Sequence, residues 1–125
     1  PIKDEMFFAE KENGAFFNNQ RIRVSNKNNI NDCLFAIGEK NTNELNLTNR
    51  KSGCAALDMA YVASGRYDGY YQKNLNIWDI AAGIILIKEA GGIINSINLD
   101  EIENLSVIAS SVNIRSKFEE KLHNF

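Results

Sequence analysis

Short runs of aromatic and β-branched residues, separated by turn residues, occupy the first part of the chain; they lie at 5–10, 15–17 and 21–24. Asn13 and Gly14 close the gap between the first two runs, and this pair is typical of β-hairpins. The polar residues 18–20 supply a second tight turn. We therefore predict a short antiparallel β-meander at residues 1–31.

The pattern changes in residues 32–125, where compact apolar runs alternate with segments of helical period. Gly65 and Gly91 follow two of these segments and are expected to end the helices. The order β-α-β-α-β-β-α predicts an α/β domain with helices packed on a sheet. The predicted strands lie at 33–37, 67–72, 93–99 and 106–110, the predicted helices at 53–64, 79–90 and 114–122, and a loop at 41–49.

The predicted helix at 79–90 is apolar on nearly every side, so we expect it to be buried on more than one side. Asp79 stands at its start, directly after Trp78. One interpretation is an N-cap, in which the carboxylate accepts hydrogen bonds from the first free N–H groups of the helix. The other is a ligand for a hard cation such as Mg²⁺. The spacing alone favours the cap.

Composition excludes several classes of protein. The hydrophobic content of 44%, the charged content of 24% and the formal net charge of -2 describe an ordinary globular protein and argue against a broad nucleic-acid-binding surface.

Cys33 and Cys54 have neither metal-site spacing nor the density of a disulfide scaffold, which favours reduced thiols in a cytoplasmic protein. His123 is the only histidine, so Ser-His-Asp and Cys-His mechanisms are not expected. The longest apolar run, 77–87, is too short to cross a bilayer.

The segment Trp78-Asp79-Ile80-Ala81-Ala82-Gly83, with Glu89-Ala90-Gly91-Gly92 after it, resembles the C-terminal signature of the inositol monophosphatase family of magnesium-dependent phosphatases. Residues 53–58 and 62–70 are similar to the segment that precedes this signature, and the meander is similar to the family's mid-chain strands. The resemblance covers essentially the whole chain. Within the family it looks closer to the bacterial inositol and extragenic-suppressor branch.

The resemblance implies an α/β (α+β) layered sugar-phosphatase fold and a set of site residues. Asp79 matches the carboxylate that binds one metal and contacts substrate hydroxyls. Gly53, Cys54 and Ala55 match the stretch that lines the polyol pocket, although a turn and packing explain them equally well. Gln72 matches a substrate-binding glutamate. Relatives usually carry Ser or Thr in place of Cys54. This difference, together with a glutamine in place of the glutamate at position 72, leaves the substrate preference open.

The family's remaining metal ligands, a Glu and an Asp-Pro-Ile/Leu-Asp-Gly-Thr motif, have no counterpart in the chain. By this resemblance residues 1–31 are the end of a missing N-terminal domain and residues 32–125 are the C-terminal domain. A single carboxylate is a poor magnesium site. We therefore expect the isolated chain to bind Mg²⁺ weakly and to hydrolyse no phosphate ester.

The resemblance implies a two-metal phosphomonoesterase that acts on inositol phosphate or another small phosphorylated polyol or sugar. Fructose bisphosphate, nucleotide bisphosphates and histidinol phosphate are alternative substrates in the wider superfamily. A second function class is a non-catalytic relative that acts through protein or RNA partners. Arg21, Arg23 and Arg66 are candidate contacts for such partners, although solvated or structural roles suit them better. The family also implies a homodimer of the full-length protein. Asp68 is expected to be structural.

Overall fold

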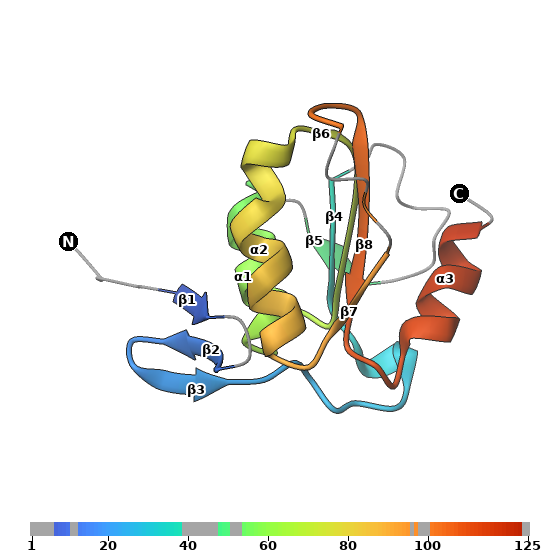
Figure 1. Cartoon of the computed structure of the whole chain (residues 1–125). Coiled ribbons are helices and arrows are strands. Elements are labelled where there is room, and N and C mark those ends of the chain that lie inside the picture. The colour runs from blue at the N-terminus through green and yellow to red at the C-terminus, as the bar shows by residue number, and fades with distance from the viewer. Residues whose placement is uncertain are drawn as a thin grey trace.

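The computed structural model describes residues 7–10, 13–38, 48–50, 54–95, 97 and 101–123. The described elements form four layers, which Figure 1 shows from left to right as a small sheet, a helix pair, a larger sheet and a single helix. The strands are β1 (Phe7–Glu10), β2 (Gly14–Phe17), β3 (Gln20–Ile22), β4 (Phe35–Ile37), β5 (Asn49–Arg50), β6 (Gly69–Leu75), β7 (Ile93–Ile94) and β8 (Leu105–Ser110). The helices are α1 (Ala55–Ala63), α2 (Ile77–Glu89), α3 (Arg115–His123) and the short 3₁₀ helix η1 (Ile30–Asp32).

The predicted meander is confirmed as the sheet β1-β2-β3, in which both pairings are antiparallel. Its second turn has two successive residues in the left-handed region, Asn18 at φ 48° and Asn19 at φ 68°. Asparagine tolerates this conformation, and two such residues give the twist that a tight hairpin needs. The rings of Phe7 and Phe17 pack across the sheet with centroids 4.7 Å apart. The domain boundary proposed between residues 31 and 32 stays a prediction.

The larger sheet has the order β5-β4-β6-β8-β7. Strand β4 is parallel to β5 and β6, whereas β8 is antiparallel to β6 and β7. Strand β5 corrects the sequence prediction, which placed these residues in or just beyond a loop: its backbone pairs with β4, a contact that local pattern does not reveal. The rest of that predicted loop, at 41–47, lies outside the described residues.

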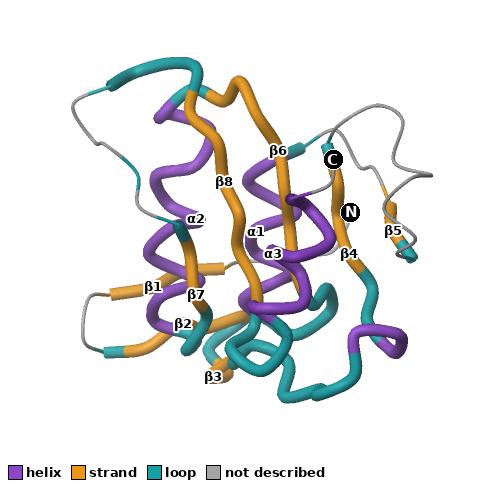
Figure 2. Tube along the Cα trace, turned by 90° about the vertical axis from the view of Figure 1, so that its right-hand side faces the viewer, coloured by secondary structure: helices purple, strands orange, loops and turns teal. Residues whose placement is uncertain are grey.

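Helices α1 and α2 cover one face of the larger sheet, and α3 covers the other, as Figure 2 shows with α3 in front of the strands and the pair behind them. The core on the α1–α2 side is built around Met59, Tyr70 and Ile80. The core on the α3 side includes Phe35 and Phe118, whose rings stack with centroids 4.5 Å apart. No helix in the described part of the chain is long and apolar enough to cross a membrane.

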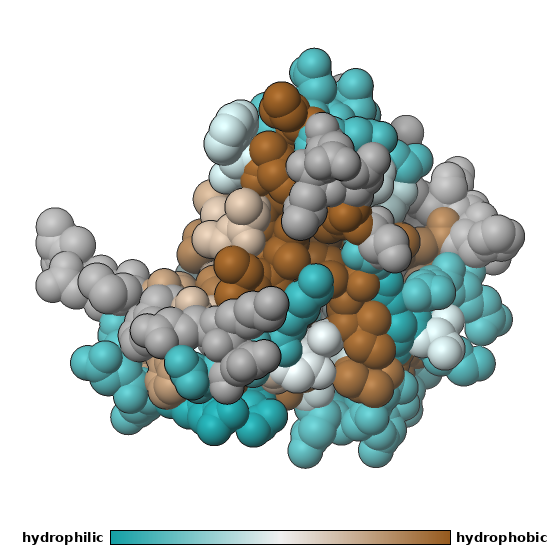
Figure 3. Space-filling view, viewed as in Figure 1, coloured by the Kyte–Doolittle hydropathy of each residue, from teal (hydrophilic) through white to brown (hydrophobic). Residues whose placement is uncertain are grey.

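Helix α2 is not buried all round, which corrects the prediction from its apolar sequence. One side packs on α1 and the sheet, while Trp78 is 79% exposed, Ile85 is 45% exposed, and Ala81 and Ala82 are exposed beside them. Figure 3 shows apolar surface gathered over α2. The meander contacts α2 through β1 and β2, but it leaves these residues open to solvent in the described structure.

Gly83 allows the close approach of α1 and α2. A Cβ atom at this position would lie 2.8 Å from both Cβ and Sδ of Met59, which is fully buried. We expect Gly83→Leu to lower the free energy of unfolding by about 2–3 kcal/mol, because the added atoms overpack the helix crossing. Chemical denaturation measures this change. Ala82→Leu, on the exposed side of the same helix, is the matched control and should shift stability by only about 0.5 kcal/mol.

Candidate active site

A pocket of about 350 Å³ lies where α1 and α2 begin and β6 ends. Four residues that the resemblance assigns to the site, Cys54, Ala55, Gln72 and Asp79, line this one pocket. The fifth, Gly53, lies outside the described residues. The sequence reasoning did not assign the other three lining residues to the site; they are Ala56, Leu75 and Trp78.

An irregularity in β6 shapes one wall of the pocket. In a regular strand Gln72 and Leu75 would point to opposite faces, because successive side chains alternate. The pairing of β6 with β8 shifts register between these two residues, and Asn74 lies between them at φ 59°. The shift lets both side chains line the same pocket. The only sequence signal for it is Asn74, a residue type that tolerates the left-handed conformation.

The N-termini of two helices meet at the pocket. Cys54 is the N-cap of α1 and Asn76 is the N-cap of α2, and neither side chain makes a capping hydrogen bond. The start of a helix carries a partial positive charge from its aligned peptide dipoles. Two such ends at one pocket favour an anionic group such as a phosphate.

Asp79 is the third residue of α2 and does not cap it, which corrects the N-cap interpretation. Its N–H donates to the carbonyl of Asn76 at 3.0 Å, and the helix begins two residues earlier than predicted. The N–H of Ile77 is held by the carbonyl of Ile102 at 2.8 Å. The Asp79 side chain is exposed at the pocket. Its carboxylate is therefore accessible to a ligand and lies in the first turn, where the helix dipole favours negative charge.

Two residues that sequence reasoning missed hold Gln72. The buried hydroxyl of Tyr70 donates a hydrogen bond to Gln72 Oε1. On the other side, Gly38 leaves room for the glutamine side chain, because a Cβ there would lie 2.4 Å from Gln72 Cδ and Oε1. The side chain of Gln72 therefore reaches the pocket in one held position.

The two cysteines differ in their environment. Cys54 is exposed at the pocket, whereas Cys33 is buried beneath α3. Burial, and then the negative charge of Asp68, raise the pKa of Cys33 to about 11. The Cys33 thiol therefore stays protonated at neutral pH, and a protonated thiol is a poor nucleophile.

We expect a disulfide reagent such as DTNB to modify one thiol of the folded chain rapidly at pH 8. That thiol is Cys54, so Cys54→Ser should abolish the rapid phase and Cys33→Ser should leave it unchanged. Because its raised pKa keeps Cys33 neutral, this residue should react only as the pH approaches 11 or when the chain unfolds. Two equally rapid thiols at pH 8 would contradict the described burial.

The pocket does not form a complete magnesium site from its own described residues. In the described part of the chain, no three His, Cys, Asp or Glu side chains cluster as metal ligands. Asp79 is the pocket's one carboxylate, Gln72 Oε1 is engaged by Tyr70, and thiolate is a soft ligand that suits Mg²⁺ poorly. The described residues can therefore supply part of a hard-cation site at most.

Asp68 and Arg66 have structural roles. Asp68 is fully buried, and its Oδ2 accepts hydrogen bonds from the N–H of Leu34 at 2.8 Å and from Lys27 Nζ at 3.3 Å. The Arg66 guanidinium lies over the ring of Phe17 in β2, 5.1 Å from its centroid, and over Tyr61 in α1, at 4.8 Å. Arg66 therefore contacts both the meander and α1.

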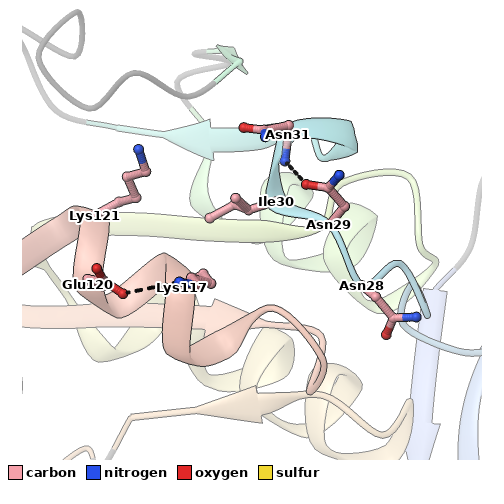
Figure 4. A pocket seen from close by; sticks show the side chains of 7 residues that line it. All are labelled: Asn28, Asn29, Ile30, Asn31, Lys117, Glu120 and Lys121. Carbon is pink, nitrogen blue, oxygen red and sulfur yellow. Dashed lines mark hydrogen bonds and ion pairs between the residues drawn. The ribbon is translucent and has the colours of Figure 1, made fainter.

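A second pocket, of about 470 Å³, lies between η1 and α3 on the other side of the larger sheet. Figure 4 shows Lys117 and Glu120 of α3 paired beside it, with Nζ and Oε2 3.8 Å apart. On the opposite side, Asn29 Oδ1 accepts a hydrogen bond from the N–H of Asn31. This lining is polar, and it includes no residue that the sequence reasoning assigned to chemistry.

Solved structures share this mixed α/β fold. The crystal structure of extragenic suppressor protein suhB from Bartonella henselae superimposes with a TM-score of 0.85 and 41% sequence identity, covering 96% of this chain and 54% of that one. The fold prediction is thereby confirmed.

The family model described as the inositol monophosphatase family matches residues 1–124, and the chain belongs to this family of phosphatases. Its curated relatives include an inositol-1-monophosphatase of Mesorhizobium japonicum, 37% identical over 89% of this chain and 48% of that protein. A putative Nus factor SuhB of Neisseria meningitidis serogroup A is 32% identical over 89% of this chain and 49% of that protein. The chain thus spans about half the length of the curated relatives it matches.

Proposed function

We propose that this chain forms the C-terminal part of the active site of a magnesium-dependent phosphomonoesterase that hydrolyses inositol phosphate to inositol and phosphate. The observation that carries the proposal is the pocket itself. Residues matched to the family's site from three separate elements line one cavity, at the N-termini of two helices. An exposed carboxylate beside two helix N-termini suits a phosphorylated polyol together with a hard cation.

Each of the four pocket residues that the resemblance assigns to the site has a proposed role. Asp79 contributes one carboxylate to the metal site and accepts hydrogen bonds from substrate hydroxyls. Cys54 and Ala55, at the start of α1, let the polyol ring approach the backbone because their side chains are small. Gln72 hydrogen-bonds the ring substituents at the end of β6. Magnesium, when bound, supplies the activation of water and the neutralisation of phosphate charge.

The remaining carboxylates of the site must come from outside the described residues, since these contain no complete ligand cluster. The proposal also includes the homodimeric state and the cytoplasmic location that the resemblance implies.

Two proteins test this proposal. The first is the isolated chain, which should show no magnesium-dependent release of phosphate from inositol 1-phosphate. The second is a chimera in which this chain replaces the matching segment of the Mesorhizobium japonicum relative. The chimera should regain magnesium-dependent turnover, because that relative supplies the rest of the enzyme. A folded chimera without turnover would contradict the proposed function. Turnover by the isolated chain would contradict the proposal that this chain supplies only part of the metal site.

A second candidate is a non-catalytic role through a protein or RNA partner. The name of the Neisseria relative, a putative Nus factor, favours it. The exposed side chains of Arg21 and Arg23 are available for such a partner. An Asp79 variant separates the two functions, because it removes the proposed metal ligand without touching either arginine.

A further inference from the structure

The turn that leads into β2 contains a chemically reactive pair of residues, Asn13 and Gly14. This is the one place in the sequence where a glycine directly follows an asparagine. The backbone nitrogen of the following residue can attack the side-chain amide carbon of an asparagine and close a succinimide ring. Glycine makes this attack easiest, because it has no Cβ to crowd the approaching nitrogen. Asn13 is exposed, so solvent reaches its side chain.

The nitrogen that would attack is engaged in the folded structure. Gly14 is buried, and its N–H donates a hydrogen bond of 2.8 Å to Oε1 of Glu89, the last residue of α2. The meander lies beside this end of α2 in Figure 1. In a succinimide the Gly14 nitrogen carries no hydrogen, so ring closure has to give up the bond to Glu89. Hydrogen bonds to charged groups are among the stronger ones in proteins, and this bond therefore opposes ring closure.

A second contact holds the same glycine within the meander. A Cβ atom on Gly14 would lie 3.1 Å from Nε and 3.2 Å from Cζ of Arg21, so the guanidinium group lies against the α-carbon. The backbone of Gly14 has φ 102°, which side-chain-bearing residues rarely adopt. The Arg21 contact stays within the sheet β1-β2-β3, whereas the Glu89 contact exists only while this sheet is docked on α2. Docking therefore determines whether the Gly14 nitrogen is protected.

We propose that Asn13 is a deamidation site that Glu89 protects while the meander is docked on α2. When the bond to Glu89 is open, the Gly14 nitrogen forms a bond to Cγ of Asn13 and gives up its proton through solvent. The bond from Cγ to Nδ2 breaks, and the side-chain nitrogen takes up that proton and leaves as ammonia. Water then opens the succinimide at either carbonyl, which yields aspartate or isoaspartate at this position. Water is the only co-reactant.

The modification makes renewed docking less favourable. Isoaspartate carries the main chain through its own side-chain carbon, which lengthens the backbone directly before the pairing of Glu10 with Gly14. Either product also adds a negative charge to a turn that docks on the carboxylate of Glu89. Deamidation thereby converts a transient loss of docking into a lasting one.

The protection is tested first by comparing the folded chain with the same chain in guanidinium chloride at one neutral pH. Peptide mapping by mass spectrometry follows the amide of Asn13 and separates aspartate from isoaspartate. The folded chain should lose this amide about tenfold more slowly than the denatured chain. Asn13→Ser should abolish the signal, which assigns it to this residue. Equal rates in the folded and denatured chains would overturn the inference.

The role of Glu89 is tested second, in variants that circular dichroism shows to be folded. Glu89→Ala removes the acceptor and should bring the rate of the folded chain close to that of the denatured chain. Glu89→Gln keeps an acceptor oxygen and should react more slowly than Glu89→Ala. Glu101→Ala removes an exposed carboxylate elsewhere and is the matched control, expected to react at the parent rate. Equal rates for Glu89→Ala and Glu101→Ala would overturn the inference. If Glu89→Ala does not fold, the comparison of Glu89→Gln with the parent decides instead, and a rate below that of the parent would contradict the protection.

Discussion

Asp79→Asn in the chimeric enzyme is expected to lower turnover of inositol 1-phosphate at least about 100-fold. Asparagine keeps the size of the side chain but removes the one carboxylate that this pocket contributes. Loss of the negative charge weakens the hard-cation site and replaces an acceptor for substrate hydroxyls with an amide. Because the effect acts through the metal, a large excess of Mg²⁺ should recover part of the activity. Steady-state kinetics over a range of Mg²⁺ concentrations measures both effects.

Two controls separate this prediction from a loss of folding. Asp32→Asn removes an exposed carboxylate on η1, away from the pocket, and should leave turnover unchanged. Asp79 is exposed in the first turn of α2, so its replacement should cost about 1 kcal/mol of stability at most, through the helix dipole. Turnover within about threefold of the parent would exclude Asp79 from the proposed role. A transcription-related activity that survives Asp79→Asn would favour the non-catalytic function.

Asp68→Ala is expected to lower the free energy of unfolding by about 2–4 kcal/mol. The substitution leaves the N–H of Leu34 without its acceptor at the entry to β4 and removes the partner of Lys27. It also leaves a gap, because Asp68 is fully buried. The carboxylate connects the loop after the meander to the central strands, so its loss affects the positions of both.

Chemical denaturation of three variants tests this role. Asp68→Asn retains an acceptor for the N–H of Leu34 and should cost less than Asp68→Ala. Asp32→Ala removes an exposed carboxylate nearby in sequence and should change stability by only about 0.5 kcal/mol. Equal stability of the Asp68→Ala and Asp32→Ala variants would show that the buried carboxylate contributes nothing to the fold.

Much of the fold could be predicted because it depends on local signals. Asn18 and Asn19 mark the hairpin turn, and both adopt the left-handed backbone that their residue type tolerates. Gly65 and Gly91, predicted to end helices, have φ values of 80° and 89°, and each follows the C-cap residue of its helix, α1 or α2. In each case the short-range preference of the residue agrees with the final structure.

The errors arose where a distant contact decided the outcome. Helix α2 begins before Asp79 because the carbonyl of Ile102 accepts a hydrogen bond from Ile77, and no local pattern indicates that partner. Apolar composition suggested that α2 is buried on every side, although Trp78 and Ile85 are exposed. Composition gives the apolar character of a helix but not the amount of protein that covers it.

In the candidate site, too, the sequence indicated some residues and missed those whose roles depend on distant contacts. Family resemblance indicated Gln72 and Asp79, and both line the pocket. It did not indicate Tyr70 and Gly38, which hold Gln72, because their roles follow from the pairing of β4 with β6 and from the side-chain packing around it. Motif matching can identify the residues that face a ligand. The residues that orient them become visible only in three dimensions.

The hydrogen bond from the N–H of Gly14 to Glu89 Oε1, at 2.8 Å, joins two positions 75 residues apart in the sequence. During synthesis the meander therefore emerges from the ribosome well before the helix on which it docks. At about 5–20 residues per second, this interval is roughly 4–15 s. Throughout that time the contacts of β1 and β2 with α2 cannot form. We expect the meander to acquire its packing against α2 only after this helix has been made, and to depend until then on protection from aggregation.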